Sequence, residues 1–184
     1  NLEVIARAGS GYDNIDIDAA SKQGIIVLNT PGENTISAAE QTMALMLAVS
    51  RNTVQANNSI NEGIWDRNKY MGAELNGKTL GIIGLGRVGS NVAKRAQAFN
   101  MNVIANDPYI PEERGERLGV ELVSKDELYE RSDYVTMHTP LTDETEHLLN
   151  KDSFAKMKDG TYIVNAARGK CVDRFDLEEA VNNG

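Results

Sequence analysis

A run of glycines between a strand-like stretch and a helix-like stretch constrains the fold more than any other feature of this sequence. The strand pattern covers Thr79–Ile83, the glycines Gly84, Gly86 and Gly89 follow it, and a helical pattern continues over Ser90–Phe99. A further strand pattern follows that helix. This order of strand, tight turn, helix and strand is typical of a βαβ unit with parallel strands, so the sequence predicts an α/β fold.

Strand-like and helix-like patterns alternate along most of the chain, which predicts right-handed helical crossovers between parallel strands. Five strands are expected in the larger part: Thr79–Ile83, Asn102–Asn106, Val120–Val123, Tyr134–His138 and Tyr162–Ala166. We assign residues 31–184 to a doubly wound parallel sheet of the Rossmann type. Because the common six-stranded form of this sheet has one strand more, we expect another strand after Gly184.

The first 30 residues form a separate small block. Strand patterns at Leu2–Ala8 and Gly24–Leu28 flank a helical stretch, Asp16–Lys22, and a turn cluster at Asn29–Gly32 ends the block. The chain begins with Asn1, not methionine, in the middle of an apolar pattern. We therefore expect a fragment of a longer protein.

Two helices are predicted from signals at their ends. Ser37 and Glu40 have the spacing of a capping box, and the helix that they would begin is apolar nearly all round up to residue 50. Such a helix should be buried between two layers or at a subunit contact. The last helix, residues 176–184, ends on Asn and Gly, which are common helix stop signals.

The glycine run also predicts a ligand. Gly84 permits a tight turn, Gly86 lets a pyrophosphate approach the backbone, and Gly89 lets the helix pack on the strand. Asp107 lies 18 residues after Gly89, where an acid can bind the hydroxyls of an adenosine ribose and would repel the extra phosphate of NADP. We therefore predict NAD as the cofactor; the alternative is a glycine turn and an Asp-Pro turn that bind nothing.

An arginine follows the last predicted strand. Ligands of open parallel sheets lie outside the carboxyl ends of the strands, and both Arg168 and Thr139 come just after such ends. An arginine there can hold a carboxylate with two hydrogen bonds and polarise a neighbouring carbonyl, which suits hydride transfer between nicotinamide and a 2-oxo acid. The alternative is a surface arginine that pairs with Asp173 or Asp176.

Hydride transfer to a ketone also needs a proton donor, which is usually a histidine. His138 lies at a strand end and could serve, although a histidine bonded locally to the backbone is the favoured interpretation. His147 is expected on a helix face.

Composition limits the partners. The formal net charge of -8 gives no general attraction for nucleic acid or anionic membranes. No apolar run approaches the roughly 20 residues of a membrane span. The single cysteine, Cys171, excludes an internal disulfide and favours a reducing compartment, so the expected location is cytoplasmic and no metal site is predicted.

Several stretches together resemble a known family. They are Arg7–Asp16, Asn29–Gly32 with Ser37–Glu40, Gly72–Gly89, His138–Pro140 and Asn165–Gly169, and they span nearly the whole chain. The chain is similar to D-isomer-specific 2-hydroxyacid dehydrogenases, oxidoreductases with a split substrate domain and an inserted NAD-binding domain. The resemblance implies that residues 1–30 are the terminal part of the substrate domain, and that residues 31–184 are an NAD-binding domain truncated at its C-terminal end.

The resemblance also implies roles for individual residues. Arg168 would be the catalytic arginine, and Arg7 and Gly9 would approach the substrate anion. The NAD site would be formed by Ser10, Gly84, Gly86, Arg87, Val88, Gly89, Asp107, Thr139, Ala166, Ala167 and Arg168. Family members dimerise through the NAD-binding domain, so we expect a homodimer or higher oligomer. Helix 37–50 and the basic pair Arg67 and Lys69 are expected to serve either that contact or the site of a neighbouring subunit.

The departures from the family pattern matter as well. In the family the acid/base histidine and its glutamate follow the next strand, beyond Gly184, so we expect this chain to bind NAD without turnover. Lys170 and Arg174 stand where relatives usually carry a glycine and an acid.

The run Gly72–Gly89 is most like members that oxidise D-3-phosphoglycerate in serine biosynthesis. The alternatives are a glyoxylate or hydroxypyruvate reductase, and an NAD-responsive module similar to the C-terminal-binding-protein corepressors.

Overall fold

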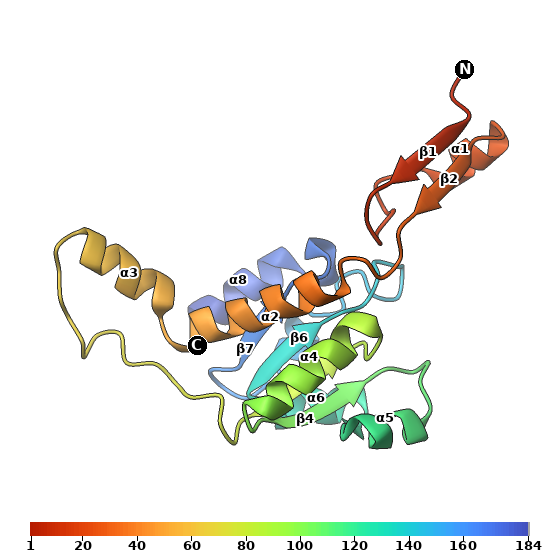
Figure 1. Ribbon diagram of the computed structural model, residues 1–184. Helices are drawn as coiled ribbons and strands as arrows, with labels where there is room; N and C mark the ends of the chain where they lie inside the picture. The colour runs from red at the N-terminus through yellow and green to blue at the C-terminus, as the bar shows by residue number, and fades with distance from the viewer. Residues whose placement is uncertain (184) are drawn as a thin grey trace.

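The computed structural model describes residues 1–183 and contains two parallel sheets (Figure 1). The strands are β1 (Val4–Arg7), β2 (Ile26–Asn29), β3 (Thr79–Ile83), β4 (Asn102–Asn106), β5 (Glu121–Leu122), β6 (Tyr134–Met137) and β7 (Tyr162–Asn165). β1 pairs with β2, and the larger sheet has the order β5-β4-β3-β6-β7. Because the chain order reverses between β3 and β6, the carboxyl ends of these two strands flank the crevice where such sheets bind ligands.

Helices cover both faces of the larger sheet, which confirms the prediction of a doubly wound fold (Figure 1). The helices are α1 (Ile17–Lys22), α2 (Thr35–Ser50), α3 (Thr53–Asn61), α4 (Arg87–Ala98), α5 (Glu112–Leu118), α6 (Lys125–Arg131), α7 (Lys151–Phe154) and α8 (Arg174–Asn183), with a short 3-10 turn at Gly169–Cys171. α2 and α4 pack on one face, and α6, α7 and α8 contribute to the other.

Each face buries its own hydrophobic cluster. Ile82 and Ile83, neighbours in β3, point to opposite faces because side chains alternate along a strand. Ile82 packs with Met46 of α2 and Val92 of α4, whereas Ile83 packs with Leu128 of α6. β3 is therefore buried on both sides, as the central strand of a doubly wound sheet must be.

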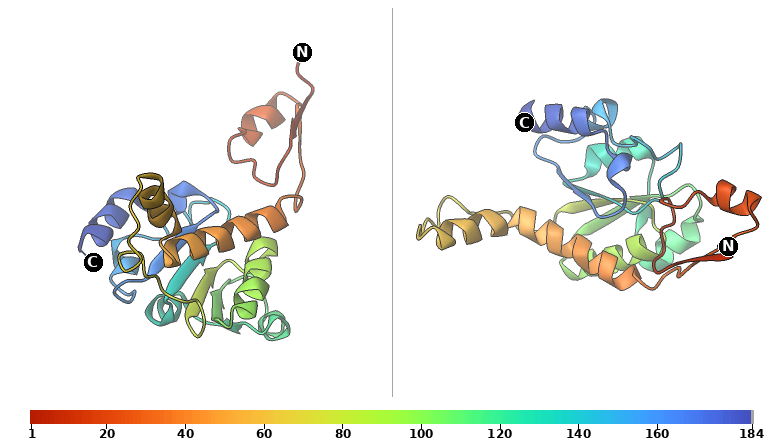
Figure 2. Two further views of the ribbon diagram at one scale, coloured as in Figure 1. Left: turned by 60° about the vertical axis from the view of Figure 1, so that its left-hand side comes forward. Right: turned by 90° about the horizontal axis from the view of Figure 1, so that it is seen from above.

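The small sheet and α3 lie at opposite ends of α2 (Figure 2). The block of β1, α1 and β2 projects beyond the N-terminal end of α2, and α3 and the irregular chain after it extend beyond the other end. Several large apolar side chains of these two parts are exposed: Val4, Ile26, Leu28, Ile60, Ile64, Trp65 and Met71.

The seven predicted strands are all present, with ends that differ by up to two residues, but the predicted capping box is wrong. The N-cap of α2 is Asn34 and not Ser37, because the helix begins one turn earlier, just after the turn at Gly32, whose φ is +97°. The last helix begins at Arg174, and its predicted stop at Gly184 lies outside the described residues.

Candidate functional site

The glycine loop joins β3 to α4. Gly84 has a φ of +91°, a conformation that favours glycine, and a side chain there would lie 3.1 Å from the backbone of His138 and the methyl group of Thr139. A side chain at Gly89 would overlap the carbonyl oxygen of Gly84, whereas nothing lies within 4 Å of the position that a side chain at Gly86 would take. The tight turn, the close packing and the open approach that the sequence predicts are thus assigned to Gly84, Gly89 and Gly86 respectively.

Asp107 follows β4 and lies against the glycine loop. Its Oδ2 accepts a hydrogen bond from the backbone N–H of Leu85 at 2.8 Å, and its Oδ1 accepts one from the N–H of Tyr109 at 3.0 Å. Each carboxylate oxygen can accept about two hydrogen bonds, so both retain capacity for a ligand. The carboxylate is therefore held in place at the edge of the loop.

Arg168 lies in the turn after β7 and reaches the small block. Its Nε and Nη2 each lie 2.8 Å from Oδ1 of Asp13, and its Nη1 donates to the carbonyl oxygen of Ala167 at 3.0 Å. Asn165 shapes the turn, because its Nδ2 donates to the carbonyl oxygen of Arg168 and its Oδ1 accepts from the N–H of Ala167. The hydrogen bond from Arg168 lowers the pKa of Asp13, so that carboxyl is ionised at neutral pH.

Asp173 and Asp176, the other candidate partners of Arg168, are bonded elsewhere. Oδ1 of Asp173 accepts hydrogen bonds from two backbone N–H groups, and its Oδ2 lies 3.2 Å from Nδ1 of His147. Oδ2 of Asp176 accepts from the N–H of Lys151. The interpretation of Arg168 as a surface arginine paired with either acid is therefore wrong.

Ser10 joins the small block to the start of α2. Its hydroxyl donates to Oδ1 of Asn34 at 2.7 Å and accepts from the backbone N–H of Gly32 at 3.1 Å. The carbonyl oxygen of Ser10 accepts from Nδ2 of Asn29. These bonds fix the connection between the two sheets on one side of the candidate site.

A cavity of about 350 Å³ lies between the small block and the carboxyl ends of β6 and β7. The predicted site residues that line it are Ser10, Arg87, Val88, Thr139, Ala166, Ala167 and Arg168. The remaining predicted residues do not line it: Arg7, Gly9, Gly84, Gly86, Gly89 and Asp107. The cavity is also lined by four residues that the sequence did not assign to the site: Gly11, Pro31, Gly32 and Asn34. The predicted turn cluster at Asn29–Gly32 includes two of them.

One polar atom in this cavity has no partner. Among the buried side-chain oxygen and nitrogen atoms of residues 1–183, only Oγ1 of Thr139 forms no hydrogen bond. A buried hydroxyl without a partner is rare in a folded protein and is well suited to receive a ligand. This hydroxyl and the open space at Gly86 are compatible with a bound dinucleotide.

Neither histidine has the environment that the sequence predicts for it. The ring of His138 lies 3.2 Å from Oγ1 of Thr136, so its local partner is a side chain and not the backbone. Burial lowers the pKa of His138 to about 4, so the ring is neutral near pH 7. His147 lies in a turn with a φ of 50°, so its prediction as a helix-face residue is wrong.

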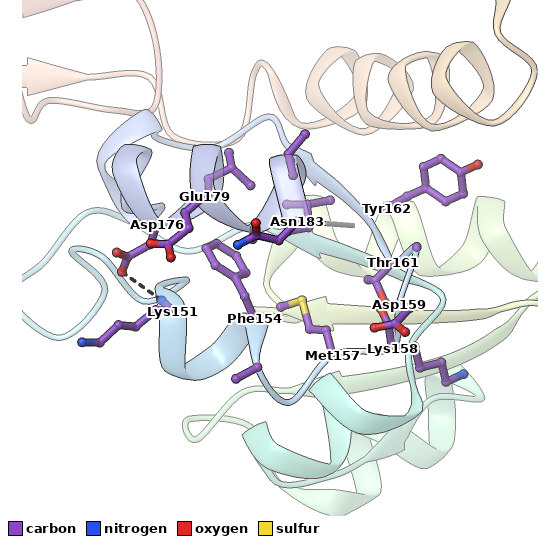
Figure 3. Close-up of a pocket in the computed structure, with 16 residues that line it drawn as sticks. Lys151, Phe154, Met157, Lys158, Asp159, Thr161, Tyr162, Asp176, Glu179 and Asn183 are labelled. Carbon is purple, nitrogen blue, oxygen red and sulfur yellow. Dashed lines mark hydrogen bonds between the residues drawn. The ribbon is translucent and has the colours of Figure 1, made fainter.

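A larger cavity of about 660 Å³ lies beside β7, between α7 and α8 (Figure 3). Its lining is mainly apolar and includes Phe154, Met157 and Leu177. It contains none of the predicted site residues. Within residues 1–183, no three His, Cys, Asp or Glu side chains gather as metal ligands would, and no helix is long and apolar enough to cross a bilayer.

A family model described as the D-isomer specific 2-hydroxyacid dehydrogenase, NAD binding domain, matches residues 43–184. The chain belongs to this family. NAD is accordingly the cofactor of the domain, as the glycine loop and Asp107 predict.

The most similar relatives include two D-3-phosphoglycerate dehydrogenases. The chain is 56% identical to that of Archaeoglobus fulgidus and 53% identical to that of Methanocaldococcus jannaschii, each over 184 residues. It is also 51% identical over 184 residues to a hydroxypyruvate reductase of Thermotoga maritima. These matches cover 100% of this chain but only 35% of each phosphoglycerate dehydrogenase and 59% of the reductase.

Solved structures of other dehydrogenases share the fold. D-lactate dehydrogenase from Aquifex aeolicus, complexed with NAD and lactic acid, has a TM-score of 0.90 and 36% identity over 100% of this chain and 55% of that one. NAD-dependent formate dehydrogenase from Staphylococcus aureus, in complex with NAD, has a TM-score of 0.91 and 39% identity over the same shares.

Proposed function

We propose that the complete protein containing this chain is an NAD-dependent dehydrogenase that oxidises D-3-phosphoglycerate to 3-phosphohydroxypyruvate, a step of serine biosynthesis. The observation that carries the proposal is the position of Arg168, whose guanidinium shares one cavity with Arg87 and Val88 at the start of α4. The identities of 56% and 53% to D-3-phosphoglycerate dehydrogenases support this substrate. Because the chain spans 35% of those relatives, we assign the activity to the complete protein.

We assign the NAD site to the carboxyl edge of the larger sheet. The open approach at Gly86 and the free N–H groups at the start of α4 would receive the pyrophosphate, and Arg87 stands beside them. Asp107 would accept hydrogen bonds from the adenosine ribose. Gly84 and Gly89 would shape the loop, and the rest of the site would be lined by Ser10, Val88, Thr139, Ala166, Ala167 and Arg168.

In the reaction, Arg168 would hold the substrate carboxylate and polarise the oxygen on C2. NAD, when bound, supplies the acceptor for the hydride that leaves C2. The hydroxyl proton must pass to a base, and His138 is a poor candidate because its pKa of about 4 makes it a weak base near pH 7. We therefore expect the histidine and its glutamate outside this chain, and the chain alone should bind NAD without turnover. Arg7 and Gly9 would approach the substrate anion.

We further assign residues 1–30 to the substrate domain and residues 31–184 to the NAD-binding domain. The separation of the two sheets supports this boundary. A homodimer or higher oligomer would use α2 and the segment with Arg67 and Lys69, and the exposed side chains of Leu45, Trp65 and Met71 support a contact there. The cytoplasm remains the expected location.

The activity is tested by NADH formation from NAD and D-3-phosphoglycerate in the complete protein. Arg168→Ala should lower kcat/KM by roughly 100-fold or more, as removal of a single transition-state donor does. Equal activity of this variant would contradict the role of Arg168. Faster turnover of hydroxypyruvate than of phosphohydroxypyruvate would favour the reductase. NAD-dependent capture of short peptides without any dehydrogenase activity would favour the corepressor-like module.

Binding is tested separately by titrating the isolated chain with NADH and NADPH. We expect NADH to bind more tightly, because the charge of Asp107 disfavours a phosphate on the adenosine ribose. Comparable affinities would contradict the role of Asp107.

A further inference from the structure

Asp13 and Arg168 form an ion pair between the small block and the larger sheet. The two residues are 155 positions apart in the sequence. Both Nε and Nη2 of Arg168 lie 2.8 Å from the same oxygen, Oδ1 of Asp13, so the carboxylate binds one edge of the guanidinium. The relative exposures of the two side chains are 42% for Asp13 and 37% for Arg168, so the pair is partly exposed and not in the core.

We propose that Asp13 is a positioning residue that orients Arg168 for the substrate carboxylate; this rests on the proposed function. A guanidinium has five N–H donors. Asp13 accepts a hydrogen bond from Nε, with Nη2 2.8 Å from the same oxygen, and the carbonyl oxygen of Ala167 accepts one from Nη1. N–H groups on both terminal nitrogens therefore remain for a substrate carboxylate, which an arginine can bind through two hydrogen bonds.

Gly11 provides a second, independent contact on the same guanidinium. A side chain at Gly11 would overlap Nη2 of Arg168, so this arginine conformation requires glycine at that position. Gly11 also accepts a hydrogen bond from Nε of Arg7 through its carbonyl oxygen at 3.3 Å. The guanidinium therefore contacts Gly11 and Asp13 of the small block on one side and the carbonyl oxygen of Ala167, in the turn after β7, on the other.

This arrangement has a measurable signature. A partly exposed ion pair contributes little to folding stability, so loss of Asp13 should leave the melting temperature nearly unchanged. A misplacement of a substrate-binding group by a fraction of an ångström nevertheless lowers the rate strongly. A positioning role and a structural role are thus distinguishable by kinetics and melting together.

The experiment uses the complete protein and compares Asp13→Ala and Asp13→Asn with Asp18→Asn. Asp18 lies in the first turn of α1 in the same block, so its variant removes the same charge away from Arg168. We expect Asp13→Ala to lower kcat/KM for the 2-hydroxy acid by about tenfold, with the KM for NAD changed less than about twofold. Asp13→Asn should recover part of the loss because an amide oxygen still accepts a hydrogen bond. Combining Asp13→Ala with Arg168→Lys should add nothing to the loss caused by Arg168→Lys alone.

Three results would overturn the proposal. They are full activity of Asp13→Ala, an equal fall of kcat/KM in Asp18→Asn, and a fall of kcat/KM in Asp13→Ala that is accompanied by an equal fall in NAD affinity and by a lower melting temperature. A readout independent of activity is the Nε–H signal of Arg168 in nitrogen-15 NMR spectra. It should be protected from exchange in the wild type and exchange rapidly in Asp13→Ala. A protected signal in a wild-type protein that oxidises no 2-hydroxy acid would refute the proposed function and the positioning role with it. Full activity of Asp13→Ala would refute the positioning role alone.

Discussion

Two glycines of one loop should separate folding from cofactor binding. A methyl group at Gly89 would overlap the carbonyl oxygen of Gly84 and lie 3.2 Å from Cγ2 of Ile82. Because α4 would have to move away from β3, Gly89→Ala should cost about 2 kcal/mol, within the usual range for overpacking. For a chain of 184 residues this loss corresponds to a fall in melting temperature of about 4–8 °C.

Gly86 is the matched control in the same loop. Its φ is -71° and no atom lies within 4 Å of the added methyl group, so Gly86→Ala should change the melting temperature by less than about 2 °C. The methyl group would nevertheless occupy the space through which the pyrophosphate is proposed to approach, so the affinity for NADH should fall by about tenfold or more.

Thermal unfolding and NADH fluorescence titration of the two variants measure both effects. If Gly89→Ala has the same melting temperature as the wild type, the close packing of α4 on the loop is not a constraint on the fold. If Gly86→Ala binds NADH as the wild type does, the pyrophosphate does not approach the backbone at Gly86.

Three further predictions follow from single side chains. Asp107→Asn should narrow the preference for NADH over NADPH by about tenfold, because it removes a negative charge beside the added phosphate; competitive titration of the isolated chain measures this. Tyr134→Phe should lower the free energy of unfolding by about 1 kcal/mol in urea titrations, because the hydroxyl forms a buried hydrogen bond of 3.0 Å with Ser50. His138 has a folded pKa of about 4 and an ordinary unfolded value near 6.5, so the unfolded chain binds more protons between these values. Stability should therefore fall by about 3 kcal/mol as the pH drops through this window, and urea titrations across it should show a smaller fall for His138→Gln.

The fold could be predicted because its strands carry a local signal. β3 and β6 are buried on both faces and read as continuous apolar runs, and the glycine loop after β3 marks the first crossover. Pattern alone does not fix where a helix begins. Ser37 and Glu40 have the right spacing for a cap. The helix nevertheless begins at Thr35, because the turn at Gly32 ends just before it.

The candidate site could be predicted only as far as topology places it. Parallel strands bring all their carboxyl ends to one edge, so Thr139 and Arg168 could be assigned to that edge from their positions after two strands. The same argument gives no information about side-chain partners. Asp173 and Asp176 are near Arg168 in the sequence and looked equally suitable. The carboxylate of Asp173 instead binds the backbone N–H groups of Phe175 and Asp176, and that of Asp176 binds the N–H of Lys151, 25 positions away.

The partner that Arg168 does have depends on how the small block is placed against the larger sheet. No local pattern encodes that placement, since Asp13 lies in a turn between β1 and α1, Arg168 follows β7 of the other sheet, and the two are 155 positions apart. An acid that orients another side chain needs only a carboxylate at the right place, and it carries no motif of its own. Gly11 is equally inconspicuous, because its lack of a side chain matters only when the guanidinium lies across it. Residues of this kind are found from the structure, and their importance should therefore be tested by the orientation of Arg168 and not by the stability of the fold.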